Sequence, residues 1–243
     1  MDAVTIALEL AVQDPSGVRI AREVGAARVE LTQALALGGL TPSLATLELA
    51  LDAAGEGGPE VHVLIRPRAG GFHYDADEIA VSVRDIERAV AAGAAGVVVG
   101  ALDASGRLDA GTIARMRDAA GAASVTLHRA IDVTADPVAA LETAAALGLR
   151  RVLTSGGASA AIDGIETLRA MATAAAGRIE VMAGSGVNAA SAPALVGAGV
   201  DALHFSAKRT IAATGDGSVA DSMGGHEVTD RDAAFAVREA LGL

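Results

Sequence analysis

One repeated unit constrains the fold of this chain more than any other feature. Short β-branched or apolar runs recur eight times, and a stretch with helical character separates each run from the next. Because parallel strands need long crossover connections, and each connection here reads as a helix, the repeat predicts parallel pairing. The predicted strands are Val4–Glu9, Arg28–Leu31, Val61–Arg66, Gly96–Gly100, Ser124–Arg129, Arg151–Ser155, Ile179–Ala183 and Ala202–Ser206.

Eight such units in 243 residues predict a single (β/α)8 TIM-barrel domain over residues 1–243. An open, doubly wound sheet has the same local pattern and is the alternative. The sequence Glu9-Leu10-Ala11-Val12 stands where a dinucleotide-binding fold would carry its Gly-x-Gly-x-x-Gly turn, which argues against that site. Residues 209–230 follow the last predicted strand without periodicity and are predicted to be a long loop: a lid, an interface arm or a disordered segment.

Composition excludes several classes of function. Nineteen Lys and Arg against thirty Asp and Glu give a net charge of −11, and aromatic residues make up 2% of the chain, so we expect no nucleic-acid partner. Cysteine is absent, which excludes disulfides, thiolate metal sites and a catalytic thiol. The longest apolar runs are far shorter than the roughly 20 residues of a membrane helix, and the start does not resemble a signal peptide. We therefore expect a cytoplasmic protein without a membrane partner.

Polar residues gather at the ends of the predicted strands, where barrels of this kind carry their active sites. Side chains alternate along a strand, so if Val29 and Leu31 face the helices, Glu30 faces the barrel. The same alternation turns Arg66 and His128 inward. The predicted catalytic residues are Glu9, Glu30, Arg66, His128, Arg129 and Asp132.

A structural interpretation of these residues stays open. Glu30 or Glu9 could pair with Arg66 in a buried ion pair that serves only stability. The orientation of His204 is undetermined, because Leu203 and Phe205 could equally be the inward pair.

Two glycine-rich turns, 154–157 and 183–188, follow the sixth and seventh strands. Glycine lets backbone N–H groups approach an anion, and cationic side chains reach the same rim, so we predict an anion-binding site for a small molecule. Two tight turns without a ligand are the alternative. The predicted binding residues are Ser155, Gly156, Gly157, Gly184, Ser185, Gly186 and Lys208.

Several motifs in one order resemble the CutC family, whose members are called copper homeostasis proteins. The resemblance implies a (β/α)8 barrel, a cytoplasmic location, self-association into a dimer or tetramer, and a copper-linked role. The matching motifs are Arg28-Val29-Glu30-Leu31, Leu37-Gly38-Gly39-Leu40-Thr41-Pro42-Ser43, Ile65-Arg66-Pro67-Arg68, Thr126-Leu127-His128-Arg129-Ala130-Ile131-Asp132, Leu153-Thr154-Ser155-Gly156-Gly157 and Val181-Met182-Ala183-Gly184.

Two hypotheses about function remain. In the first, the chain is a CutC-like copper homeostasis protein whose barrel mouth binds a small anion. In the second, it is an enzyme of lyase or isomerase type acting on a small, perhaps phosphorylated, metabolite without a direct copper role. Thr32 stands where the family typically has Cys, and Cu(I) prefers thiolate or thioether ligands, so a thiolate copper site is excluded. The sequence assigns no metal ligand and no cofactor.

Overall fold

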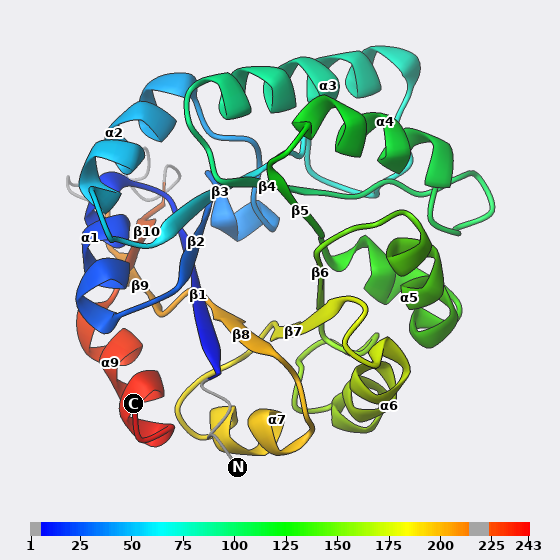
Figure 1. Ribbon diagram of the computed structural model, residues 1–243. Helices are drawn as coiled ribbons and strands as arrows, with labels where there is room; N and C mark the ends of the chain where they lie inside the picture. Colours follow the sequence, from blue (N-terminus) through cyan, green and yellow to red (C-terminus); the bar gives the residue numbers. More distant parts are fainter. Residues whose placement is uncertain (1–5, 214–223) are drawn as a thin grey trace.

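The computed structural model describes residues 6–213 and 224–243 and shows eight parallel strands closed into a barrel (Figure 1). Each strand pairs with the next along the chain, and β8 pairs with β1 to complete the ring. The predicted TIM barrel is confirmed, and the open-sheet alternative is wrong. The strands are β1 Ala7–Val12, β2 Arg28–Leu31, β3 Glu60–Leu64, β4 Gly96–Val99, β5 Ser124–Leu127, β6 Arg151–Thr154, β7 Glu180–Gly184 and β8 Ala202–Phe205.

Helices surround the barrel, and several begin at side-chain caps. In α1, for example, the Asp14 carboxylate accepts a hydrogen bond from Gly17 N–H at 2.8 Å, and Pro15 occupies the first turn. Among the described residues, no helix is long and apolar enough to cross a membrane. The helices are α1 Pro15–Val24, α2 Leu44–Ala54, α3 Ala76–Ala91, α4 Ala110–Ala120, α5 Pro137–Ala146, α6 Ile165–Ala175, α7 Ala192–Gly197 and α9 Arg231–Ala240, with 3₁₀ helices η1 Leu35–Leu37 and η2 Arg129–Val133.

The apolar core lies mainly between the strands and the helices. Val29, Leu31 and Val63 belong to this outer core, as strand alternation predicts. A second, much smaller cluster consists of Leu153, Met182 and Ala202, three strand residues separate from the outer core. Residues at the other inward positions are largely polar.

Buried ion pairs take the place of aliphatic packing through much of the interior. Arg28 Nε lies 2.9 Å from Glu9 Oε2, and both side chains are nearly inaccessible to solvent. Arg151 Nε donates to Glu180 Oε2 at 2.7 Å, and its Nη1 donates to Thr126 Oγ1 at 3.1 Å. Barrels usually fill these layers with Val, Ile and Leu, so here the interior depends on charge pairing.

Strand β1 differs from its prediction. It was expected over Val4–Glu9, but it runs over Ala7–Val12, where Val12 pairs in register with Leu31 of β2. The strand continues because the residues after Glu9 are apolar and buried. Glu9 therefore lies in the middle of the strand and not at its carboxyl end, so its predicted place at the barrel mouth is wrong.

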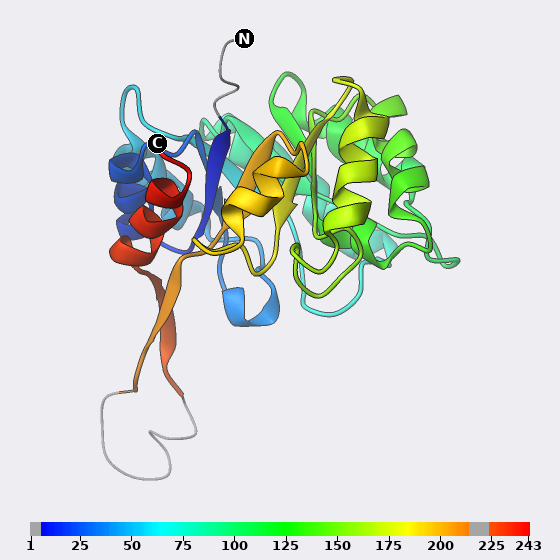
Figure 2. The ribbon, with the colours of Figure 1, turned by 90° about the horizontal axis from the view of Figure 1, so that it is seen from below.

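The segment 209–230 was predicted to be a loop, and its two ends are instead paired. Strands β9 (Lys208–Ile211) and β10 (His226–Thr229) form an antiparallel ribbon that projects from the barrel on the same side as η1 (Figure 2). The predicted lid, interface arm or disordered stretch falls partly on residues 214–223, which lie outside the described residues.

We predict that Arg28→Met lowers the free energy of unfolding by about 3–5 kcal/mol, because it leaves the Glu9 charge buried with one cation fewer. Arg19 is exposed on α1, and Arg19→Met is the matched control, with an expected change within about 0.5 kcal/mol. Chemical denaturation at pH 7 measures both. Equal stabilities of the two variants would show that the interior does not depend on this pair.

Candidate functional site

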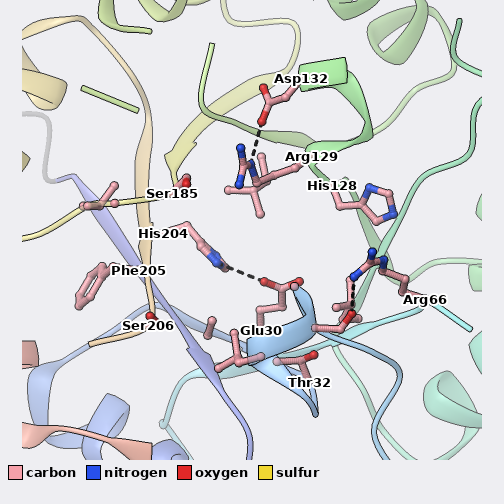
Figure 3. A pocket seen from close by; sticks show the side chains of 18 of the residues that line it. Glu30, Thr32, Arg66, His128, Arg129, Asp132, Ser185, His204, Phe205 and Ser206 are labelled. Atoms are coloured by element: carbon pink, nitrogen blue, oxygen red, sulfur yellow. Dashed lines mark hydrogen bonds and ion pairs between the residues drawn. The ribbon is translucent and has the colours of Figure 1, made fainter. Parts of the chain in front are cut away.

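A pocket of about 520 Å³ opens at the carboxyl ends of the barrel strands (Figure 3). It is lined by Thr32, Leu64, Phe72, His204 and Ser206, which were not among the predicted site residues. Most predicted residues also line it. These are Glu30, Arg66, His128, Arg129, Asp132, Ser185, Gly186 and Lys208.

A chain of polar contacts connects the barrel interior to this pocket. Glu9, fully buried below the pocket, lies 2.9 Å from Nδ1 of His204 through Oε1. On the other edge of the ring, His204 Nε2 lies 3.2 Å from Glu30 Oε2, which lines the pocket. Figure 3 shows His204 and Glu30 facing each other across the pocket floor. The order Glu9–His204–Glu30 is that of a proton relay ending at a buried carboxyl group in the pocket lining.

The two carboxyl groups of this relay have opposite pKa shifts. Burial alone would raise the pKa of Glu9, but the hydrogen bond and charge of His204, together with Arg28, outweigh it and lower the pKa to about 2. Burial raises the pKa of Glu30 to about 7, against the charge of His204 and with the help of Glu9. Burial would lower the pKa of His204, yet Glu30 and Glu9 raise it overall. Glu30 thus lies beside a histidine whose pKa is raised, and a carboxyl group with a pKa of about 7 suits general acid–base catalysis.

Arg66 does not form the predicted ion pair with either carboxylate. Its Nη1 donates to the carbonyl oxygens of Leu37 and Gly39, each at 2.9 Å, and its Nη2 donates to Gly70 O at 2.8 Å. The guanidinium thus holds two loops together at the mouth. The structural alternative of a buried pair between Arg66 and either carboxylate is wrong, because Glu30 pairs with His204 and Glu9 pairs with His204 and Arg28.

His128 lines the pocket, and its ring is neutral at pH 7. Burial and then the positive charge of Arg66 lower the pKa of His128 to about 3. The Ala130 N–H donates to Nδ1 at 3.1 Å, so the ring proton lies on Nε2.

The glycine turn after β6 already holds an anion, and that anion is the side chain of Asp132. The Asp132 carboxylate accepts hydrogen bonds from Ser155 N–H at 3.0 Å, from Gly157 N–H at 3.2 Å and from Thr154 Oγ1 at 2.5 Å. Arg129 Nε also contacts it, at 2.8 Å. The prediction that Ser155, Gly156 and Gly157 hold a ligand is wrong in this geometry, because an internal carboxylate occupies the turn.

The turn after β7 is different, because its residues line the pocket. Ser185, Gly186 and Val187 form that part of the wall, and within residues 6–213 and 224–243 no protein atom accepts a hydrogen bond from their N–H groups. Ser185 has a φ of 81°, an uncommon value for a residue with a side chain. Gly184 serves packing, since a Cβ there would lie 2.4 Å from Leu153 Cδ1.

Lys208 begins β9 at the rim of the pocket. Its Nζ lies 2.5 Å from Glu227 Oε1 of β10, and its side chain is partly exposed. Its positive charge lies at the pocket mouth and is partly neutralised by Glu227 of the ribbon.

His204 is the functional candidate that the sequence left undetermined. Leu203 and Phe205 belong to the outer core, which turns His204 inward. The signal was present in the pairing, because a parallel barrel places His204 opposite Glu9 of β1. With β1 expected to end at Glu9, the pairing of Glu9 with His204 could not be inferred from the sequence.

Glu9, Glu30 and His204 also offer one ligand atom each within 4.8 Å of one another, the spacing of a small metal site. Nδ1 of His204 pairs with the Glu9 carboxylate, which also pairs with Arg28. Two atoms, Nε2 of His204 and a Glu30 oxygen, are left to share an ion, which favours the relay over a metal centre.

Comparisons with known proteins agree with one another. The family model described as the CutC family matches residues 6–209. A CutC protein of Xanthomonas campestris pv. campestris (strain B100) is 45% identical over 207 residues, 85% of each chain. A CutC protein of Sinorhizobium medicae (strain WSM419) is 48% identical over 191 residues, 79% of this chain and 76% of that protein. The crystal structure of a Streptococcus agalactiae CutC named for copper homeostasis superposes with a TM-score of 0.78 and 30% identity, covering 83% of this chain and 98% of that one.

We predict that Glu30→Gln gains stability relative to the wild type as the pH rises from about 4.5 to 7. The raised pKa keeps Glu30 protonated in the folded state, so its contribution to stability is present below pH 4.5 and is lost as the pH rises through about 7. The difference in unfolding free energy between variant and wild type should change by about 2–4 kcal/mol. Exposed Glu48→Gln on α2 is the control and should show no such trend. A flat difference for Glu30→Gln would mean that this carboxyl is ionised throughout.

Proposed function

The chain belongs to the CutC family, and we propose that its barrel mouth is the active site of an acid–base enzyme acting on a small anionic metabolite. The contact of 3.2 Å between Glu30 and His204, inside a pocket large enough for such a molecule, carries this proposal. A lyase or isomerase needs a group that takes a proton and returns it near pH 7, and the raised pKa of Glu30 meets that need.

Glu9 acts as the positioning residue of the relay. By accepting a hydrogen bond from Nδ1–H, it orients the His204 ring with Nε2 toward Glu30. Its negative charge also favours the imidazolium form of His204. A proton lost from a substrate to Glu30 can then be shared with His204, because the negative charge of Glu9 stabilises the protonated ring.

The anionic group of the substrate is bound, in this proposal, at the ends of β7 and β8. Ser185, Gly186 and Val187 line the pocket, and their N–H groups have no acceptor within the described residues. The cationic side chains of Arg129 and Lys208 line the same pocket. This moves the anion site from the predicted turns after β6 and β7 to the pair after β7 and β8, where barrels of this kind commonly bind phosphate.

The described donor groups do not fit Cu(I), although one relative is named for copper homeostasis. The sequence has no Cys, and Thr32 Oγ1, at the position of the family's Cys, donates to Leu40 O at 3.0 Å. Met116 and Met171 are buried in the outer core. Met182 lies inside the barrel with Arg28 Nη2 at 3.9 Å from its sulfur. Cu(I) needs two or more soft ligands at one point, and these residues do not provide them.

We predict that small phosphorylated or carboxylated metabolites raise the melting temperature of the protein in a thermal-shift screen. For the compound that is turned over, Glu30→Gln should lower kcat by about 10²–10⁴-fold, the usual contribution of a general acid–base group, with little change in Kd. Exposed Glu48→Gln should keep wild-type kcat.

A Cu(I) competition assay belongs beside this screen. No stabilising metabolite, together with tight stoichiometric Cu(I) binding, would contradict the proposal and favour a copper-binding protein. Wild-type turnover by Glu30→Gln would contradict the role of Glu30.

A further inference from the structure

Two buried hydrogen-bond donors at the pocket have nothing to donate to. Within the described parts of the chain, neither His128 Nε2 nor Arg66 Nε has a hydrogen-bond partner. The two residues are 4% and 7% exposed, so both lie well inside the protein. A buried donor without an acceptor costs about 1–3 kcal/mol, and native proteins rarely leave one unexplained.

In each of the two residues, one specific N–H group has no acceptor among the described residues. The ring proton of His128 must lie on Nε2, because Nδ1 accepts from the Ala130 N–H. The terminal nitrogens of Arg66 are taken by three carbonyl oxygens, which leaves Nε–H as the remaining donor. Local structure thus fixes both groups in orientation, and both residues line the pocket next to the ring of Phe72.

Phe72 covers both donors. Its ring centroid lies 4.7 Å from that of His128 and 5.3 Å from Cζ of Arg66. Phe72 is half-buried, lines the pocket, and follows two exposed glycines, Gly70 and Gly71, in the connection between β3 and α3. A shift of this one side chain would let an acceptor atom in the pocket reach the two N–H groups.

We infer that His128 Nε2–H and Arg66 Nε–H bind the carbonyl oxygen of the substrate, so the substrate class is a small carbonyl compound that also carries an anionic group. This inference rests on the proposed acid–base function, which supplies Glu30 in the same pocket. Two N–H donors that bind one carbonyl oxygen stabilise the enolate that forms when the neighbouring carbon loses a proton. A neutral imidazole serves as such a donor in triosephosphate isomerase, a known example on another protein.

The step balances without a further reactant. The Glu30 carboxylate takes the proton from the carbon next to the carbonyl group. The electron pair of that C–H bond forms a C=C bond, and the carbonyl π pair moves to the oxygen, which the two N–H groups hold. Where the carbon that lost its proton carries a hydroxyl group, the hydroxyl proton passes to the enolate oxygen and Glu30 returns its proton to the former carbonyl carbon. The hydroxyl oxygen becomes the new carbonyl oxygen, and the product is an isomer of the substrate.

Calorimetric titration with 2-phosphoglycolate tests the inference, because its carboxylate imitates the planar enolate and its phosphate suits the β7 and β8 side. Inorganic phosphate, which lacks the carboxylate, is the comparison ligand. We expect the wild type to bind 2-phosphoglycolate at least tenfold more tightly than phosphate.

The variants separate the two nitrogens of His128. His128→Asn keeps an acceptor for the Ala130 N–H but removes the Nε2 donor, and should weaken 2-phosphoglycolate binding ~10–100-fold without affecting phosphate. His128→Gln places an amide N–H near the Nε2 position and should restore most of the affinity. Equal binding by wild type and His128→Asn, or no binding of 2-phosphoglycolate at millimolar concentration, would overturn the inference.

Tyrosine fluorescence reports the shift of Phe72 separately. The chain has no Trp and one Tyr, and that residue, Tyr74, lies two positions from Phe72. Binding of 2-phosphoglycolate should change its emission and phosphate should not; an unchanged emission with bound 2-phosphoglycolate would contradict the covering role of Phe72.

If binding depends on His128 while Glu30→Gln keeps full turnover, the acid–base function fails and the oxygen subsite stands. If Glu30→Gln loses turnover while His128→Asn binds normally, the reverse holds.

Discussion

The buried charge of Glu9 is the constraint on which the site depends. A carboxylate in the middle of a barrel is costly unless it is paired, and here Arg28 and His204 approach it from the two neighbouring strands. That pairing fixes the His204 ring with one nitrogen toward the interior and the other toward Glu30. The paired charges inside the barrel therefore position the side chains at its mouth. The proposed acid–base chemistry depends on the same residues as the stability of the fold.

Cationic side chains at the mouth are mostly engaged by the protein itself. Arg66 binds backbone carbonyls, Arg129 binds Asp132 and Lys208 binds Glu227. In the proposed function, recognition of an anion falls largely to backbone N–H groups at the end of β7 and to the charge that these pairs leave uncompensated. Such fixed donors lose little side-chain entropy on binding, which suits a small ligand.

The count of eight strand–helix units predicted the barrel. Strand alternation was enough to predict the inward positions of Glu30, Arg66 and His128, because a buried strand shows its two faces directly in the sequence. It was not enough for contacts between distant segments. Strand β1 extends past Glu9, because the apolar residues after it are buried and continue the strand. The carboxylate of Asp132 filling the turn after β6 depends on the geometry of η2, which no local pattern shows. His204 needed the pairing of the last strand with the first, a contact nearly 200 residues apart in sequence.

The protonation of His204 tests the central claim most directly. Nitrogen-15 NMR of the ring, followed across pH, gives the midpoint at which His204 loses its proton. The relay predicts a midpoint above 6.5, the ordinary value of histidine, and a downward shift of that midpoint in Glu9→Gln. A wild-type midpoint at or below 6.5, unchanged in Glu9→Gln, would contradict the relay and with it the acid–base role of the barrel mouth.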